Sequence, residues 1–180
     1  MQRSSKFATL LLGAAILVLP SAGAFASDPD KAFFDQAEGN WSGPGEIIAG
    51  KYKGTKFICN FIGSTPGKKA GMTLDGSCRV GVFNQKMKAT VERLGNGYKG
   101  KFLDGAAGEG MDIVSGNVVG GNKAVFGINR KKLKGAMVAK MASDDAMVVT
   151  VAVKVEDRMI PVIGMSLKRM DETTVGSIAE

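Results

Sequence analysis

The feature that most constrains the fold is a series of short alternating runs that begins at Trp41. In the clearest run, residues 72–80, methionine, leucine, cysteine and valine share one face, and polar residues occupy the other. Turn-forming residues such as Gly95-Asn96-Gly97 and Gly120-Gly121-Asn122 separate the runs. Parallel strands need a connection of about a dozen residues, usually a helix, and no such segment lies between the runs. Neighbouring strands are therefore predicted to pair antiparallel in up-and-down order.

The predicted fold class is all-β. About ten strands rarely stay in one open sheet, so we expect the meander to close into a barrel, with a two-sheet sandwich as the alternative. A short N-terminal helical turn is expected within residues 27–37, where Asp30 can cap the start and Phe33 and Phe34 face the body. The strands are expected near residues 45–51, 57–61, 72–80, 85–93, 98–103, 111–119, 123–130, 134–142, 146–155 and 159–169.

The first 26 residues have the pattern of a secretory signal peptide. Arg3 and Lys6 supply the positive start, residues 7–19 form the apolar core, and Ala24 and Ala26 are the small residues before the cleavage point. We predict cleavage after Ala26 and a periplasmic mature protein, in which no second apolar run is long enough to span a membrane. The expected organisation is a signal peptide over 1–26, a leader with a short helix over 27–40, a β-barrel domain over 41–170 and a flexible polar tail over 171–180.

The chain has two cysteines, Cys59 and Cys78. Export makes a disulfide between them the default interpretation. If the loop between their strands centres on residues 65–72, Cys59 lies opposite Cys78 and Phe61 lies opposite Gly76. A redox pair usually shows Cys-x-x-Cys spacing and a metal site needs further ligands, so we predict a structural disulfide. Closing this loop is worth roughly 3 kcal/mol on a chain-entropy estimate.

Histidine is absent from the chain, which limits its chemistry. Without histidine there is no Ser-His-Asp or Cys-His arrangement, and the usual haem and zinc ligands are missing. The ten methionines fit core filling or a pliable apolar cavity better than a copper site. We therefore expect no catalytic residues, no metal and no cofactor, and we predict that the protein is not an enzyme.

The charge balance is basic, with a net charge of +7 that falls to about +5 after leader removal. This charge either keeps the protein in solution or attracts an anionic envelope component such as lipopolysaccharide, acidic polysaccharide or a membrane face. Nucleic acid is not an expected partner, because stacking aromatics do not interleave with the basic residues. The densest basic run is a solvated hairpin or an anion-docking loop, assisted by Lys51, Lys53 and Lys56 if these share its face. The candidate anion-binding residues in that run are Arg130, Lys131, Lys132 and Lys134.

The triplet Gly39-Asn40-Trp41 resembles the Gly-x-Trp opening of the lipocalin and calycin superfamily. In that family the tryptophan plugs one end of the barrel and a basic residue of the last strand covers it. The resemblance implies Arg169 as the partner of Trp41, with Lys168 as the fallback, and such stacking is worth about 0.5–2 kcal/mol. The chain is also similar to small exported alphaproteobacterial proteins with a Trp-x-Gly-x-Gly pattern followed by two cysteines. The matching residues here are Trp41, Gly43, Gly45, Cys59 and Cys78.

Together these features predict a non-enzymatic exported β-barrel that binds a small apolar or amphiphilic ligand in its lumen. Because small barrels can be filled by their own side chains, this function requires a cavity of at least about 300 Å³. The alternative is an envelope-interaction or inhibitor protein whose basic surface binds an anionic polymer or a protein partner. The identity of the ligand and the oligomeric state are left open by the sequence.

Overall fold

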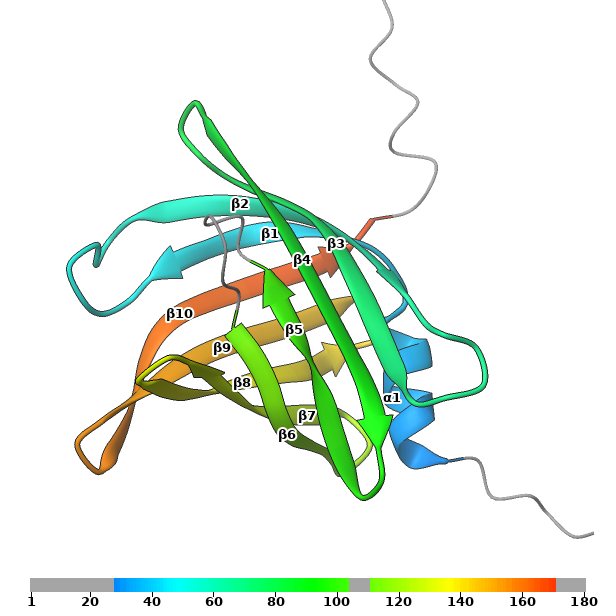
Figure 1. The fold of residues 1–180 in the computed structure, drawn as a ribbon. Coiled ribbons are helices and arrows are strands. Elements are labelled where there is room, and N and C mark those ends of the chain that lie inside the picture. Colours follow the sequence, from blue (N-terminus) through cyan, green and yellow to red (C-terminus); the bar gives the residue numbers. More distant parts are fainter. Residues whose placement is uncertain (1–27, 104–110, 171–180) are drawn as a thin grey trace, which may run out of the picture.

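The computed structural model describes residues 28–103 and 111–170. The predictions made for residues 1–26 and 171–180 lie outside these ranges. The described chain forms a short helix and ten strands that close into one antiparallel barrel, in which β10 pairs with β1 (Figure 1). The predicted all-β up-and-down barrel is confirmed, and the sandwich alternative is wrong. The elements are α1 (Pro29–Ala37), β1 (Gly39–Ile47), β2 (Lys56–Ser64), β3 (Gly71–Val80), β4 (Phe83–Leu94), β5 (Gly97–Leu103), β6 (Met111–Val119), β7 (Lys123–Arg130), β8 (Leu133–Ser143), β9 (Ala146–Val155) and β10 (Arg158–Arg169).

The first strand begins earlier than predicted. The expected range was 45–51, whereas β1 spans Gly39–Ile47 and so starts within the predicted leader. Glycine and proline at positions 43–45 have low strand propensity, which moved the expected boundary toward the C-terminus. In the barrel this composition is needed, because a Cβ atom on Gly43 would lie 2.0 Å from the carbonyl oxygen of Ser166. Pro44 falls in a gap of the β1–β10 register, where the ladder uses no donor.

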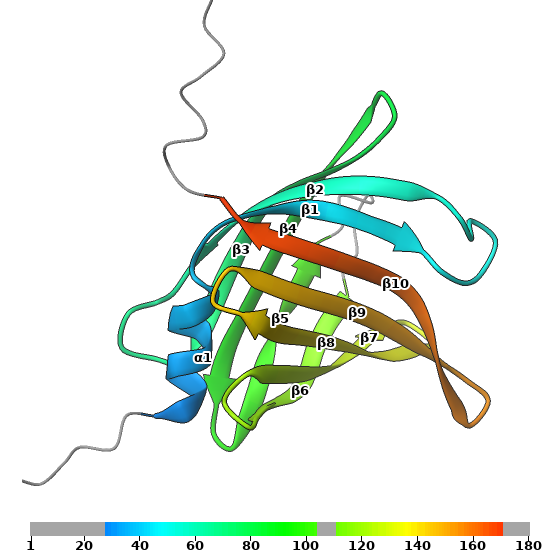
Figure 2. The ribbon, with the colours of Figure 1, turned by 180° about the vertical axis from the view of Figure 1, so that it is seen from behind.

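The helix forms where it was expected, but its N-cap is Asp28 rather than Asp30. The Asp28 side chain accepts a hydrogen bond of 3.0 Å from the backbone nitrogen of Asp30. Pro29 then takes the first helical turn, where a missing N–H costs nothing. The helix lies across one end of the barrel and buries Phe33 and Phe34 against it, as expected (Figure 2). In the described part of the chain, no helix has the length and apolar composition that crossing a bilayer requires.

The predicted disulfide is confirmed, because Cys59 on β2 is bonded to Cys78 on β3. The two residues lie directly opposite each other in the β2–β3 register, and Phe61 lies opposite Gly76. A Cβ atom on Gly76 would lie 2.0 Å from the Asn60 carbonyl oxygen, so glycine permits this close approach. The crosslink joins two strands whose inward faces line the lumen.

The two ends of the barrel differ. The closed end carries α1 together with the β2–β3, β4–β5, β6–β7 and β8–β9 connections. The other end, here called the distal end, carries the β1–β2, β3–β4, β7–β8 and β9–β10 connections, which point away from α1 (Figure 1). Since strands alternate inward and outward residues, each strand contributes a row of apolar side chains to the space between these ends.

Candidate functional site

The helix α1 closes one end of the barrel and is called the floor of the lumen here. Arg169 and Trp41 hold its C-terminal end. The Arg169 guanidinium lies 4.4 Å from the centre of the Trp41 ring, which is 1% exposed. Arg169 donates hydrogen bonds to the carbonyl oxygens of Gln36 and Glu38, and the Trp41 indole nitrogen donates one of 2.9 Å to that of Ala37. Carbonyls in the last turn of a helix have no partner within the helix. Three successive carbonyls are therefore satisfied from β1 and β10.

The structure brings together the two residues that the lipocalin resemblance implied. They come from strands that pair with each other, since Trp41 lies opposite Arg169 in the β1–β10 register. The fallback residue, Lys168, is exposed on the opposite face of β10 and pairs with Ser42 instead. The guanidinium is suited to this position because its planar fork can bond two carbonyls while it stacks on a ring.

A second group, which the sequence reasoning missed, holds the N-terminal end of the floor. Arg93 on β4 forms ion pairs with both Asp28 and Asp30. The Tyr98 hydroxyl donates a hydrogen bond of 2.8 Å to Asp30, and the Arg93 guanidinium lies 5.7 Å from the Tyr98 ring centre. Arg93 and Tyr98 lie opposite each other across the turn at 95–97, so the predicted hairpin register could have revealed them as a pair.

Protonation in this second group follows from its contacts. The hydrogen bond from Arg93 holds the pKa of the Asp28 carboxyl below its usual value of 3.8. Burial, followed by the Asp30 carboxylate, raises the pKa of the Tyr98 hydroxyl. At neutral pH the acid is charged, the phenol is neutral, and the helix start is tied to β4 and β5.

Between these two attachments, α1 presents an aromatic surface to the lumen. Phe34 lies 5.5 Å from Tyr98 and Tyr98 lies 5.9 Å from Phe126, measured between ring centres. Phe33 packs edge-on against Phe34 at 5.4 Å. Such contacts add specific geometry to the burial of each ring. The helix is therefore a packed floor rather than a loose appendage.

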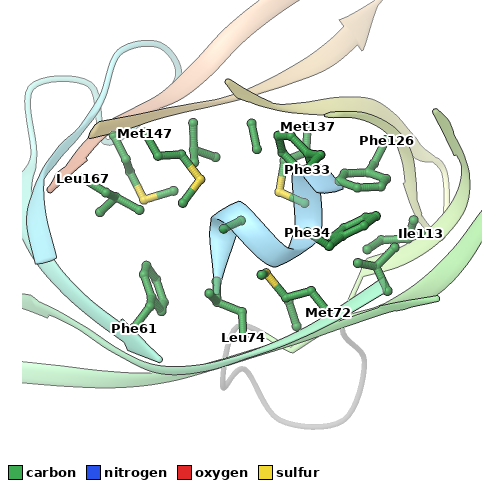
Figure 3. Close-up of a pocket in the computed structure, with 16 residues that line it drawn as sticks. Phe33, Phe34, Phe61, Met72, Leu74, Ile113, Phe126, Met137, Met147 and Leu167 are labelled. Carbon is green, nitrogen blue, oxygen red and sulfur yellow. The ribbon is translucent and has the colours of Figure 1, made fainter. Parts of the chain in front are cut away.

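Above this floor lies an apolar cavity (Figure 3). Its volume is about 90 Å³, and the residues that line it are alanine, valine, leucine, isoleucine, methionine and phenylalanine. Four of them are the flexible methionines Met72, Met137, Met147 and Met165, which come from β3, β8, β9 and β10. This cavity alone is smaller than the roughly 300 Å³ that the ligand-binding prediction requires. A larger ligand must also use the distal half of the lumen or displace these methionines.

Inward side chains in the distal half of the lumen differ in burial. Phe57, Met87 and Met111 belong to the inward rows of β2, β4 and β6 and remain partly exposed. Other inward residues of the distal half, Cys59, Ile128 and Val151, are buried. The unfilled lumenal space is therefore the cavity above α1.

The candidate anion-binding residues lie at that distal end. Arg130, Lys131, Lys132 and Lys134 form the β7–β8 hairpin, in which Lys131 takes a positive φ of 54° at the turn. The β1–β2 connection, with Lys51 and Lys53, and the first residue of β2, Lys56, lie at the same end. The structure therefore gathers both basic segments at one end, although anion binding by them stays a prediction. Among the described residues, no group of three or more histidine, cysteine, aspartate or glutamate side chains is arranged to hold a metal ion.

Comparison with known proteins defines the fold class. No protein-family model matches the chain. No curated protein sequence matches it significantly either. Among solved structures, the crystal structure of Rv2717c from M. tuberculosis is similar, with a TM-score of 0.58 and 12% sequence identity. The aligned region covers 80% of this chain and 99% of the Rv2717c chain. At this identity the likeness shows a shared barrel fold, and the lipocalin resemblance stays a prediction.

Proposed function

We propose that this protein is a non-enzymatic, exported binding protein that holds a small apolar or amphiphilic molecule in the lumen of its barrel. The observation that carries the proposal is the lumen itself, which is apolar, floored by α1 and left with an unfilled cavity above that helix. Barrels of this size either pack their interior with side chains or keep room for one small ligand. The unfilled apolar cavity above α1 favours the second arrangement.

The dimensions restrict the ligand. A space of about 90 Å³ is smaller than the roughly 150 Å³ engineered cavity that accepts benzene, so the deep part suits a narrow aliphatic end rather than a fused ring. Each methylene group buried there contributes about 0.8 kcal/mol. The remainder of a longer molecule would extend from there toward the distal half of the lumen. Methionine side chains can change rotamer to widen the deep part.

The compartment forms part of the proposal. A disulfide between Cys59 and Cys78 is compatible with an oxidising, extracytoplasmic location, which is where the signal-peptide pattern would direct the chain. In the periplasm, an apolar molecule has low solubility between the two membranes. A barrel with an apolar lumen would shield such a molecule from water.

Native mass spectrometry of the protein purified from its own periplasm tests the proposal. We expect a mature polypeptide that starts at residue 27, accompanied by a second species carrying a bound small molecule. Ala139→Leu fills the cavity from the inward face of β8 and should abolish the second species. Ala136→Leu on the same strand is the matched control, because position 136 alternates outward and should leave the species intact. Bare polypeptide in the wild type, or a bound mass unchanged by Ala139→Leu, would refute lumenal binding.

A second candidate function, attachment to an anionic envelope component, is favoured by the gathering of basic residues at the distal end. It uses the outer rim, whereas ligand binding uses the lumen. One protein can therefore carry out both.

A further inference from the structure

The distal end exposes large apolar side chains on several separate hairpins. At the β3–β4 turn, Val82 is 91% and Phe83 77% exposed, and Tyr52 in the β1–β2 connection is 62% exposed. Val155 and Met159 flank the β9–β10 turn and are also exposed. Figure 1 shows the β3–β4 hairpin projecting well beyond the neighbouring strands, and the other connections pointing to the same side. These five residues are called the distal rim.

Basic residues alternate with the apolar residues at this end. Lys51 and Lys53 flank Tyr52, and the Lys51 ammonium lies 5.4 Å from the Tyr52 ring centre. Arg79 and Lys86 lie on either side of the β3–β4 turn, and both are exposed. Among the described distal connections, acidic residues occur only in the β9–β10 turn, at 156 and 157. The rim therefore combines apolar tips with positive charge.

This combination fits a lipid bilayer better than a dissolved polymer. A soluble polyanion would neutralise the lysines but would leave the valine and phenylalanine at the hairpin tip in water. At a bilayer surface the same tips enter the boundary between headgroups and acyl chains, while lysine and arginine meet anionic phosphates.

We propose that the distal rim docks the protein onto an anionic lipid bilayer, with α1 directed away from it. In this orientation the distal end of the lumen faces the membrane, which gives an apolar molecule a short route between acyl chains and barrel. That route rests on the proposed function. The docking itself does not, since it depends on the outer surface alone.

Flotation of the full mature protein with vesicles tests the docking. The vesicles contain phosphatidylglycerol and phosphatidylcholine, or phosphatidylcholine alone, and each is used at low and high salt. We expect binding to the anionic vesicles that weakens with salt. Each basic residue near an anionic surface contributes about fivefold in partitioning, so Lys51→Gln with Lys53→Gln should lower it roughly 25-fold. The matched control is Lys68→Gln with Lys69→Gln, an exposed pair at the closed end that should change it less than about twofold.

A second pair of variants tests the apolar contribution. Val82→Ser with Phe83→Ser should lower partitioning at least about tenfold by removing the tips that enter the bilayer. Leu94→Ser at the opposite end of the same strand, where Leu94 is 63% exposed, should leave it unchanged. The substituted lysines and the residues Val82 and Phe83 are all exposed, so these substitutions should change stability little. Equal midpoints of urea unfolding should verify that the variants fold like the wild type.

Three results would overturn the docking: no binding to anionic vesicles, an equal loss in the closed-end controls, or undiminished binding of the Val82→Ser, Phe83→Ser variant. The third result, joined with tight binding to soluble acidic polysaccharide, would identify a dissolved polyanion as the partner. Ala139→Leu should float with vesicles as well as the wild type does. If the wild type floats with vesicles while native mass spectrometry of the wild type finds no ligand, lumenal binding fails and docking stands. A wild type that carries a ligand but does not float would overturn docking and leave lumenal binding standing.

Discussion

Arg169, the last residue of the last strand, stacks on Trp41 of the first strand at 4.4 Å and bonds the final carbonyls of α1. A single side chain thus connects the seam where the barrel closes to the helix that floors it. Trp41 contributes to the same connection through its bond to Ala37. Because the floor limits the deep cavity, the stability of this contact bears directly on the proposed site.

Replacement of Arg169 by methionine should lower the free energy of unfolding by about 2–4 kcal/mol. The change removes three charge-assisted hydrogen bonds, to the carbonyl oxygens of Gln36, Glu38 and Asp144, and the contact with the indole ring. Arg169→Lys should recover little of this, since a single ammonium cannot reproduce the planar fork. Urea unfolding followed by far-ultraviolet circular dichroism measures both. Lys168→Met is the matched control and should stay within about 0.5 kcal/mol, so an equal loss there would contradict the assignment.

Acid sensitivity should originate partly at the start of α1. The pKa of Asp28 is lowered in the folded protein, chiefly by the hydrogen bond from Arg93. A carboxyl whose folded pKa is depressed contributes stability above its unfolded pKa of 3.8, and that stability is lost as pH falls through the folded value. Unfolding curves recorded downward from about pH 5 should show this loss.

Asp28→Asn isolates the charge, because asparagine can still cap the helix. Since the ion pair is about one-third exposed, the variant should lose only about 1 kcal/mol at neutral pH and depend less on pH in the acid range. Asp75→Asn removes a more exposed pairing with Lys88 and is the control. A wild-type and Asp28→Asn pair with parallel acid profiles would contradict the role given to Arg93.

The disulfide should add about 3 kcal/mol to the free energy of unfolding, as a crosslink between residues 19 apart in sequence. Reduction of the wild type, or Cys59→Ala with Cys78→Ala, should remove it, and urea midpoints under oxidising and reducing conditions measure the loss. The double variant should be insensitive to reductant. Thiol labelling of the unfolded, unreduced wild type should fail, and successful labelling would contradict the crosslink.

The sequence was most informative where the alternating pattern and the position of the connecting loop indicated the same strand pairing. The period of two within residues 72–80 and the position of the intervening loop together gave the register of Cys59 with Cys78. It was less informative where composition opposed the fold. Gly43 and Pro44 argue locally against a strand. The close approach of β10 to β1 explains Gly43, and Pro44 falls in a gap of the β1–β10 register. The helix cap was misplaced because Asp28 and Asp30 are both good cap residues, and only the fold shows Asp28 accepting from the Asp30 backbone nitrogen.

The candidate site was predictable in kind but not in size. Alternation predicts an apolar interior, and the resemblance implied the pair Trp41 and Arg169. The remaining volume depends on barrel diameter and on the rotamers of several methionines, neither of which is fixed by local sequence. The distal rim also depends on topology, because Tyr52 and Phe83 are far apart in the chain and lie at the same end through the up-and-down order of the strands.

The effect of Ala139→Leu on stability gives a test of the cavity that needs no ligand. In a fully packed core, a larger side chain forces neighbours out of their rotamers and costs about 1–3 kcal/mol. Ala139 borders empty space, so leucine should instead stabilise the ligand-free protein by about 0.5–2 kcal/mol. The contribution comes from apolar atoms that fill a void without displacing Met137 or Met147.

Urea unfolding of the ligand-free protein measures whether Ala139→Leu raises or lowers the free energy of unfolding. Ala136→Leu is the outward-facing control on the same strand. The control should change stability by less than about 0.5 kcal/mol, as surface substitutions usually do. A stabilised Ala139→Leu that also loses the bound species in native mass spectrometry would tie the ligand to the void above α1. A destabilised one would mean that the closed half is packed as a core, and any ligand would then have to lie nearer the distal end.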